Sequence, residues 1–253
     1  MELNIILITQ ARMGSSRLPG KVLREINGTS LLKIQLTRLK KVSLISDIIV
    51  ATTLNIHDSI IFNRSIQWGF SSTRGSESDV LDRFYQSVKN KNADWIVRVT
   101  SDCPLIDPIL IDKVILYATQ NNVDYCSNTL LENFPDGQDI EVFKFSALEV
   151  AWQNAFLKSD REHVTPFIKK NSDFNRGNLF KAKNYNCFRD YSKIRMTVDE
   201  ESDFKLIKRL IEDLGVNENW ETYAKHIIDN NLITVNAGII RNDGYIRSLK
   251  NDN

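Results

Sequence analysis

Short runs that are apolar at every position alternate with amphipathic patterns along the first half of the chain. The clearest of these runs are IILI at residues 5–8 and IIVA at residues 48–51. A strand that is apolar on both of its faces is typical of a parallel sheet covered by helices on each side. Because these runs alternate with segments of helical periodicity, we predict an α/β fold with a doubly wound, mixed and mostly parallel sheet.

The same patterns predict the individual elements. The expected strands cover 3–9, 47–52 and 94–100, and the expected helices cover 30–41, 56–68, 78–90 and 110–119. Residues 71–77 indicate a loop. The second half is less regular, with strands predicted over 140–145, 178–183 and 193–198, two helices within 201–230, and a small excursion from the sheet near 125–145. Because the sequence has neither an internal repeat nor a Pro/Gly/Ser-rich linker, residues 1–253 are predicted to form a single domain.

Composition and charge exclude several classes of protein. The chain has 33 basic and 32 acidic side chains and a formal net charge of +1, so any strongly positive surface must be local. A nucleic-acid partner is therefore not expected. The apolar run near the N-terminus is too short for a signal peptide or a membrane span, so we expect a cytoplasmic protein without a membrane partner. The three cysteines are scattered, as expected of free thiols.

A basic loop follows the first predicted strand, in the stretch ITQARMGSSRLPGKVL at residues 8–23. Ligands of open α/β sheets bind outside the carboxyl ends of the strands, which is where this loop begins. Gly14 and Gly20 allow a sharp turn, and Arg12, Arg17 and Lys21 could neutralise a triphosphate. The loop has neither the Walker A pattern nor the GxGxxG fingerprint. The loop taken alone is therefore compatible with two interpretations, a phosphate-binding site or a basic loop exposed to solvent.

Several segments, in the same order along nearly the whole chain, carry a resemblance to a known family. They are QARMGSSRLPGKVL, RGSESDVLDRFYQ, VRVTSDCPLIDP, DYCSNTL, FPDGQDIEVF, REHVTPFI, RMTVDEESDF and RNDGYIRSL. In them the chain resembles the cytidylyltransferases that make CMP-sugars, the CMP-Kdo and CMP-sialic acid synthetases, and most closely the branch called spore coat polysaccharide biosynthesis protein F. The resemblance implies a Rossmann-like nucleotidyltransferase fold and a homodimer.

The same resemblance implies an activity. The expected enzyme is Mg²⁺-dependent and transfers CMP from CTP to an acidic sugar-type acceptor with release of pyrophosphate, for cell-surface polysaccharide biosynthesis. The nucleotide-binding residues that the resemblance implies are Ala11, Arg12, Met13, Gly14, Ser15, Arg17, Lys21, Arg74, Ser76 and Asp102. Arg12 and Arg17 would act in catalysis at the β- and γ-phosphates, and Lys21 at the α-phosphate.

The segment RGSESDVLDRF also permits purely structural roles. Ser76 and Asp79 have the spacing of a helix start. Asp79 and Arg83 have the spacing of an ion pair on a helix surface. The residues alone therefore leave the role of this segment open, and only the resemblance implies that it lies beside the nucleotide.

Two aspartates follow predicted strands and would lie at the same edge of the sheet as the basic loop. Asp102 follows WIVRVTS, and Asp199 follows KIRMTV. Mg²⁺ commonly binds to one or two carboxylates together with substrate phosphates. An aspartate before a helix, such as Asp199, is also a favoured N-cap, so the residues alone leave both roles open. The resemblance implies that Asp102 and Asp199 hold Mg²⁺.

Four further polar residues are assigned to a small anionic acceptor. Asp139 and Glu141 lie two residues apart, so they would share one face of a strand. Arg161 and His163 lie close together in SDREHVTPF. The alternatives are an acidic strand face in solvent and a histidine with a structural role. The resemblance implies that the segment of Asp139 and Glu141 lies near the acceptor.

Three alternative functions are compatible with the sequence. CMP transfer to a phosphonate or phosphate acceptor would use the same chemistry. A nucleotide-sugar-dependent glycosyltransferase can share such a sheet, but the stretch Ser101-Asp102-Cys103-Pro104 lacks the Asp-x-Asp motif that those enzymes often carry. The third alternative is a catalytically silent nucleotide-binding protein. The presence of the basic loop and of both aspartates argues against it.

Overall fold

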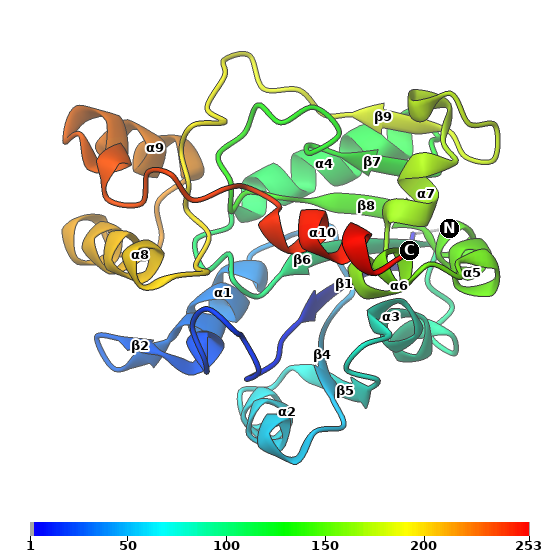
Figure 1. Cartoon of the computed structure of the whole chain (residues 1–253), viewed down its shortest axis with the longest axis horizontal. Coiled ribbons are helices and arrows are strands. Elements are labelled where there is room, and N and C mark those ends of the chain that lie inside the picture. The colour runs from blue at the N-terminus through cyan, green and yellow to red at the C-terminus, as the bar shows by residue number, and fades with distance from the viewer. Residues whose placement is uncertain (1–2, 253) are drawn as a thin grey trace.

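The computed structural model describes residues 3–252, in which a seven-stranded mixed sheet has helices on both faces (Figure 1). The strand order is β5-β4-β1-β6-β8-β7-β9. Strands β5, β4, β1 and β6 run parallel to one another, β8 is antiparallel to β6 and β7, and β9 is parallel to β7. The predicted doubly wound, mostly parallel fold is confirmed. The strands are Ile5–Gln10 (β1), Asp47–Thr53 (β4), Ser71–Gly75 (β5), Trp95–Thr100 (β6), Tyr125–Ser127 (β7), Glu141–Lys144 (β8) and Ala182–Asn184 (β9).

Helices connect the parallel strands, as crossovers in such a sheet require. The α-helices of residues 3–252 are Leu31–Leu39 (α1), Ser59–Gln67 (α2), Val80–Val88 (α3), Pro108–Gln120 (α4), Phe145–Asn154 (α5), Lys158–His163 (α6), Pro166–Lys170 (α7), Glu201–Leu214 (α8), Trp220–Asp229 (α9) and Asp243–Ser248 (α10). Smaller elements are the strand pair Glu25–Ile26 (β2) and Thr29–Ser30 (β3) and the 3₁₀ helices Lys21–Leu23 (η1), Ile56–Asp58 (η2), Asp173–Asn175 (η3), Leu232–Thr234 (η4) and Leu249–Asn251 (η5). Within this range, every helix is too short or too polar to cross a lipid bilayer.

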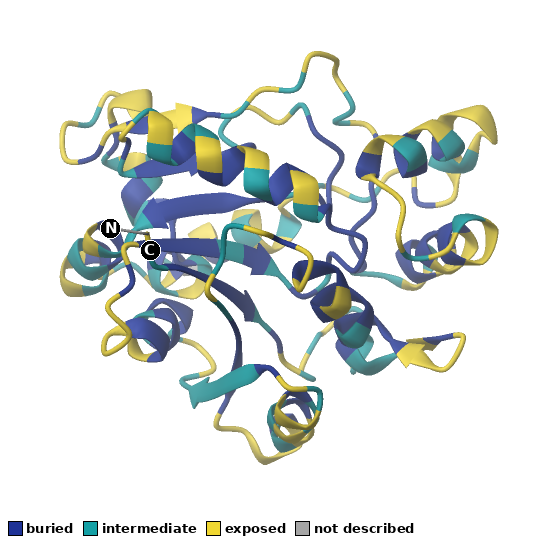
Figure 2. Ribbon diagram, turned by 180° about the vertical axis from the view of Figure 1, so that it is seen from behind, coloured by how far each residue is buried: buried dark blue, intermediate teal, exposed yellow. Residues whose placement is uncertain are grey.

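Alternate residues of β1 point to opposite faces of the sheet and enter two separate cores. Ile5 and Leu7 pack with residues of α1, α4, α8 and α9, whereas Ile6 and Ile8 pack with residues of α3, α5 and α7. Figure 2 shows the central strands buried and the surrounding helices exposing their outer sides. Because both faces are covered, the edge at which the parallel strands end is left for ligands.

The loop predicted over 71–77 is wrong in its first part, because Ser71–Gly75 forms the edge strand β5. This strand pairs in parallel with β4, with Ser71 opposite Ile49. Its side chains are polar and half-buried, as an edge strand tolerates. Such a strand has no apolar pattern from which it could be predicted.

The strand predicted over 193–198 is also wrong. This segment is extended, but it forms only an isolated bridge to the loop 128–140. Some of its backbone hydrogen bonds are made with a loop and not with a neighbouring strand. The amide of Val198, for example, donates to the carbonyl oxygen of Asp102 at 2.8 Å. Its alternate residues Ile194, Met196 and Val198 are apolar because they enter the core, and its end brings Asp199 beside Asp102.

The excursion predicted near 125–145 is shorter than expected. Both of its ends belong to the sheet, as β7 and β8, and only residues 128–140 leave it. The strand predicted over 178–183 lies slightly later, as β9. The loop 128–140 carries Asp136 and Asp139 to the wall of a pocket.

Candidate active site

Two adjoining pockets open beside the ends of β1 and β6. The first pocket has a volume of about 440 Å³ and the second about 770 Å³. Their walls share Arg17, Asp102, His163 and Asp199, so they form two halves of one cleft. The residues of the basic loop that line the first pocket include Ala11, Arg12, Ser15, Arg17 and Lys21.

The basic loop, residues 11–21, folds back on itself and is held in shape by hydrogen bonds of its backbone. Gly20 has a φ of +70°, a conformation that favours glycine, and its amide donates to the carbonyl oxygen of Met13 at 2.9 Å. The amide of Met13 donates in turn to Oδ1 of the buried Asp58 at 2.7 Å. In the described part of the chain, Met13 and Gly14 are absent from the lining of both pockets. The contacts of Met13 fix the shape of the loop.

Lys21 joins the two aspartates that were assigned to a metal. Its Nζ lies 3.0 Å from Oδ2 of Asp102 and 2.8 Å from Oδ1 of Asp199. Arg17 adds a second cation, 3.2 Å from the other oxygen of Asp199. The alternative role of Asp199 as a helix cap is wrong, because Glu200 occupies the N-cap of α8. The Asp199 carboxylate is therefore directed toward the basic loop.

The electrostatics of this cluster favour its charged form. Burial by itself lowers the pKa of Lys21, but the attraction of Asp102 and Asp199 outweighs it, and the net pKa is raised. Burial likewise opposes ionisation of Asp102, yet chiefly the Lys21 ammonium lowers the pKa of Asp102 to about 2. Lys21 and Asp102 are therefore both ionised at neutral pH.

The two carboxylates fit a Mg²⁺ ion. Their oxygens converge on one positive centre, and carboxylate oxygens combined with substrate phosphates and water are the ligands that Mg²⁺ commonly takes. Residues 3–252 contain no cluster of three or more His, Cys, Asp and Glu side chains suited to a metal. A metal bound here would therefore take its remaining oxygen ligands from substrate phosphates or water.

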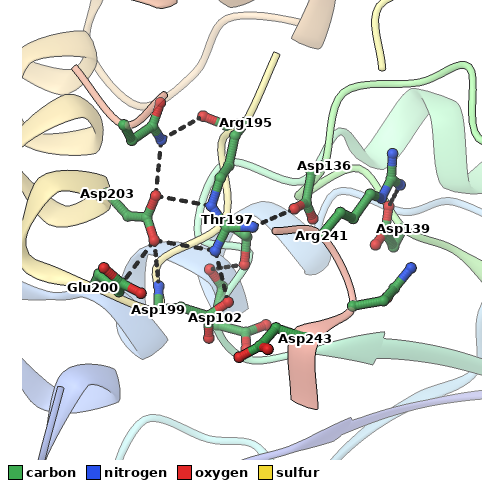
Figure 3. Close-up of polar contacts among 12 residues, drawn as sticks. Asp102, Asp136, Asp139, Arg195, Thr197, Asp199, Glu200, Asp203, Arg241 and Asp243 are labelled. Atoms are coloured by element: carbon green, nitrogen blue, oxygen red, sulfur yellow. Dashed lines mark hydrogen bonds and ion pairs between the residues drawn. The ribbon is translucent and has the colours of Figure 1, made fainter. Parts of the chain in front are cut away.

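Arg195 lies behind this cluster and joins three carboxylates (Figure 3). Its guanidinium donates to Asp136, to Asp199 at 2.7 Å and to Asp203 at 2.9 Å. Burial lowers the pKa of Arg195, but these carboxylates raise it well above its ordinary value. Asp203 also accepts from the amide of Glu200, which completes the capping box of α8. Arg195 thereby fixes the position of Asp199 relative to the second pocket.

Glu141 lies in the wall of the second pocket, where four side chains contact its carboxylate. It accepts hydrogen bonds from Tyr125 and Thr165, both at 2.6 Å, and forms ion pairs with Arg98 and Lys169. Burial raises the pKa of Glu141, but chiefly Lys169 and Arg98 hold it well below its usual range. Two cations therefore share one carboxylate, which leaves a local excess of positive charge in this wall.

Two aspartates of the loop 128–140 form another part of the same wall. Oδ1 of Asp139 lies 2.6 Å from Nη2 of Arg241. Burial raises the pKa of Asp139, and burial together with the Asp139 charge raises the pKa of Asp136 to about 7, against the pull of Arg241 and Arg195. Asp136 can thus take up a proton near neutral pH.

His163 lines both pockets. Burial, and after it the positive charges of Arg98 and Lys169, lower the pKa of His163 to about 4, so its imidazole is neutral at pH 7. Its Nε2 is buried and has no hydrogen-bond partner among the described residues. The ring packs edge-on against Tyr245, with 5.1 Å between centroids. A neutral imidazole with an unused nitrogen therefore lies where the two pockets meet.

Comparison with known proteins identifies the family. A family model described as cytidylyltransferase matches residues 6–229. The chain belongs to the cytidylyltransferase family. An uncharacterized protein of Methanocaldococcus jannaschii is 46% identical over 211 residues, which cover 82% of this chain and 83% of that protein. The spore coat polysaccharide biosynthesis protein SpsF of Bacillus subtilis is 33% identical over 217 residues, covering 84% of this chain and 88% of SpsF.

Solved structures agree with the family and the fold. A cytidylyltransferase from Leptospira borgpetersenii has a TM-score of 0.84 and 32% sequence identity, covering 95% of this chain and 100% of that one. CMP:2-keto-3-deoxy-manno-octonic acid synthetase in complex with CTP has a TM-score of 0.60 and 15% identity, covering 83% of this chain and 99% of that one. The second likeness concerns the fold alone.

Besides Met13 and Gly14, two more residues assigned to the nucleotide lie outside both pockets of this cytidylyltransferase-family chain. Arg74 donates to the carbonyl oxygens of Thr53 at 2.9 Å and Asn55 at 3.0 Å, at the end of the edge strand. The hydroxyl of Ser76 accepts from the amide of Asp79 at 3.0 Å, before α3 begins. In the described residues both side chains serve the local fold, as the capping spacing of Ser76 and Asp79 indicates.

Arg161, assigned to the acceptor, also lies outside both pockets. Its Nε lies 2.7 Å from Oδ2 of Asp79, and its Nη1 donates to the carbonyl oxygen of Ala155 at 2.9 Å. It therefore ties α6 to the start of α3. The surface pair of Asp79 with Arg83 is wrong, because Asp79 faces Arg161 and Arg83 is buried.

The C-terminal segment, residues 231–252, contributes to the candidate site although it lies beyond the range that the family model matches. Asn242, Asp243, Gly244 and Tyr245 line the second pocket, and α10 crosses in front of β6 and β8 in Figure 1. The segment RNDGYIRSL carries part of the resemblance, but no periodicity or motif chemistry in it predicts a pocket residue. For Arg195, the only indication in the sequence is its position four residues before Asp199.

Proposed function

We propose that the protein transfers CMP from CTP to an anionic sugar-type acceptor and releases pyrophosphate. The observation that carries the proposal is the convergence of Asp102 and Asp199 on Lys21 in the part of the cleft that both pockets share. A nucleotide in the first pocket and an acceptor in the second would meet at this point. Membership of the cytidylyltransferase family supports the same chemistry.

The reaction is a displacement at the α-phosphorus of CTP. The acceptor oxygen forms a bond to that phosphorus, the bond from phosphorus to the oxygen bridging to the β-phosphate breaks, and pyrophosphate leaves. Mg²⁺ held by Asp102 and Asp199 would neutralise phosphate charge and lower the pKa of the attacking hydroxyl. Arg12 and Arg17 neutralise the β- and γ-phosphates, and Lys21 stabilises the charge that grows on the α-phosphate. The hydroxyl proton passes to solvent.

The second pocket supports an acceptor that carries an acid group. Arg98 and Lys169 share the single carboxylate of Glu141, so their remaining donors can bind an anion. A relative from Geotalea daltonii named 3-deoxy-manno-octulosonate cytidylyltransferase, 27% identical over 187 residues, is consistent with a sugar acid. The relationship to SpsF points to polysaccharide biosynthesis. A phosphonate or phosphate would satisfy the same cations and is the second candidate acceptor.

The experiment that tests the proposal follows pyrophosphate release. The purified protein is incubated with Mg²⁺, each of the four nucleoside triphosphates and pools of sugar acids, sugar phosphates or phosphonates. The proposal expects release with CTP and the sugar-acid pool, and none when EDTA removes the metal. Release only with the phosphonate or phosphate pool would mean that the acceptor is a phosphonate or phosphate and not a sugar acid. CTP binding without release in any pool would instead support a catalytically silent protein.

A further inference from the structure

Arg83 is a buried guanidinium in the wall of the first pocket that has no acidic partner. Only 3% of the residue is exposed, although it lines the pocket. Within residues 3–252, every other Lys or Arg of this wall forms an ion pair, namely Arg12, Arg17, Lys21, Arg98 and Arg247. Arg83 forms none in this range. Asp58 and Glu77 attract Arg83 without forming a direct ion pair with it. A buried cation without a direct ion pair is costly unless a ligand compensates it.

The side chain of Arg83 is held in one position. Nη1 donates to the carbonyl oxygen of Ser76 at 2.9 Å. The stem lies so close to Gly75 that a Cβ at that glycine would be 3.0 Å from Cγ of Arg83. Nε is buried without a hydrogen-bond partner in the described structure. Burial and the neighbouring Arg12 lower the pKa of Arg83 to about 10, which still leaves it charged at neutral pH.

We propose that Arg83 binds the cytosine ring of CTP and selects that base. The inference rests on the proposed function, because a cytidine nucleotide must enter the first pocket. Arg12, Arg17 and Lys21 already supply three cations for the phosphates along the basic loop. Arg83 comes instead from α3, one turn from the apolar Val80, which lines the same pocket. A rigid planar donor beside an apolar side chain suits a flat, neutral base.

The hydrogen-bonding edge of cytosine explains how such a residue would select. Cytosine has two adjacent acceptors, O2 and N3, which match neighbouring N–H donors of a guanidinium. Uracil carries a hydrogen on N3, so it would leave one donor of Arg83 unpaired and facing another donor. A site built to pair a polar group strongly rejects a ligand that cannot pair it.

The test measures the binding of CTP, UTP, CMP and pyrophosphate by calorimetry, and thermal stability without nucleotide. The variants are Arg83→Met and Arg83→Lys, with the exposed Arg189→Met as a control for the loss of one positive charge. For Arg83→Met we expect the dissociation constants of CTP and CMP to rise about 10-fold or more, with pyrophosphate binding unchanged. The preference for CTP over UTP should narrow, and the melting temperature should stay the same or rise, because an uncompensated cation is removed.

Three other results would overturn the inference. Weaker binding of CTP and pyrophosphate with unchanged CMP binding would assign Arg83 to the phosphates. A lower melting temperature with unchanged CTP binding and unchanged preference would make Arg83 a structural residue. Wild-type protein that binds none of the nucleotides would overturn the proposed function, and the role of Arg83 with it.

Discussion

The two pockets of the cleft obtain their charges in different ways. The first takes Arg12, Arg17 and Lys21 from one short loop and contains in Arg83 a buried cation without an acidic partner in the described structure. The second is assembled from distant segments, and each carboxylate in its described wall already has a cationic partner. The first pocket therefore keeps Arg83 free for a ligand, whereas the spare positive charge of the second pocket lies at Glu141, which Arg98 and Lys169 share.

The largest effect on turnover is expected at Lys21, which joins Asp102 and Asp199. Lys21→Ala should lower turnover by about 10²- to 10³-fold, because the charge that grows on the α-phosphate loses its nearest cation. Pyrophosphate release under saturating substrates measures this. The control is Lys208→Ala, an exposed lysine on α8. A folded Lys21→Ala protein with full turnover would break the assignment of Lys21 to the reaction.

Arg195 tests whether the ion pairs behind the second pocket support the fold. Arg195→Met leaves Asp136, Asp199 and Asp203 without their shared cation, and we expect a loss of about 3–5 kcal/mol in the free energy of unfolding. Denaturant unfolding measures it. The matched variant Arg209→Met removes an exposed pair on α8 and should cost less than about 1 kcal/mol. Equal losses in the two variants would contradict the supporting role of Arg195.

The two acids first assigned to the acceptor should differ in their effects. Glu141→Gln releases both Arg98 and Lys169, so we expect kcat/KM for the acceptor to fall about 10-fold while the KM for CTP changes little. Asp139→Asn breaks a single ion pair, with Arg241, and should have a smaller effect. Steady-state kinetics with each substrate varied in turn would show this. A larger effect of Asp139→Asn would contradict the expectation that Glu141 contributes more than Asp139 to the use of the acceptor.

A further prediction is a pH dependence of stability at Asp136. Its pKa is about 7 in the folded protein against 3.8 in the unfolded chain, so between pH 4 and pH 7 the folded state binds more protons. Stability from this group is therefore present at low pH and is lost as the pH rises. The wild type should lose more stability than Asp136→Asn between pH 4 and pH 7. Parallel unfolding free energies of the two proteins would contradict the raised pKa.

The contrast between the pockets also explains what could be predicted from the sequence. The strand β1 and the basic loop are local patterns, so both could be predicted, and the confirmed parallel core follows from the same apolar runs. The ion pairs of Arg195 with Asp136 and of Glu141 with Lys169 join segments far apart in the chain. No local pattern records such contacts. The roles of the residues that do line the cleft stay predictions.

Other differences between the predictions and the structure arise from the environment of single side chains. Arg83 has the spacing of a surface pair with Asp79, and only the packing of α3 shows it to be buried. Arg161 carries the charge expected of an acceptor site, yet it is used within the fold. The polar strand β5 could not be predicted either, because an edge position removes the apolar pattern.

The most direct test of the central claim follows the α-phosphate itself. CTP labelled with ³²P at the α-position is incubated with Mg²⁺, a sugar-acid pool and either the wild type or the double variant Asp102→Asn, Asp199→Asn. If the protein transfers CMP as proposed, the label moves from CTP into a CMP–acceptor conjugate with the wild type and stays in CTP with the variant. Label that stays in CTP with the wild type for every acceptor, or an equally active double variant, would contradict it.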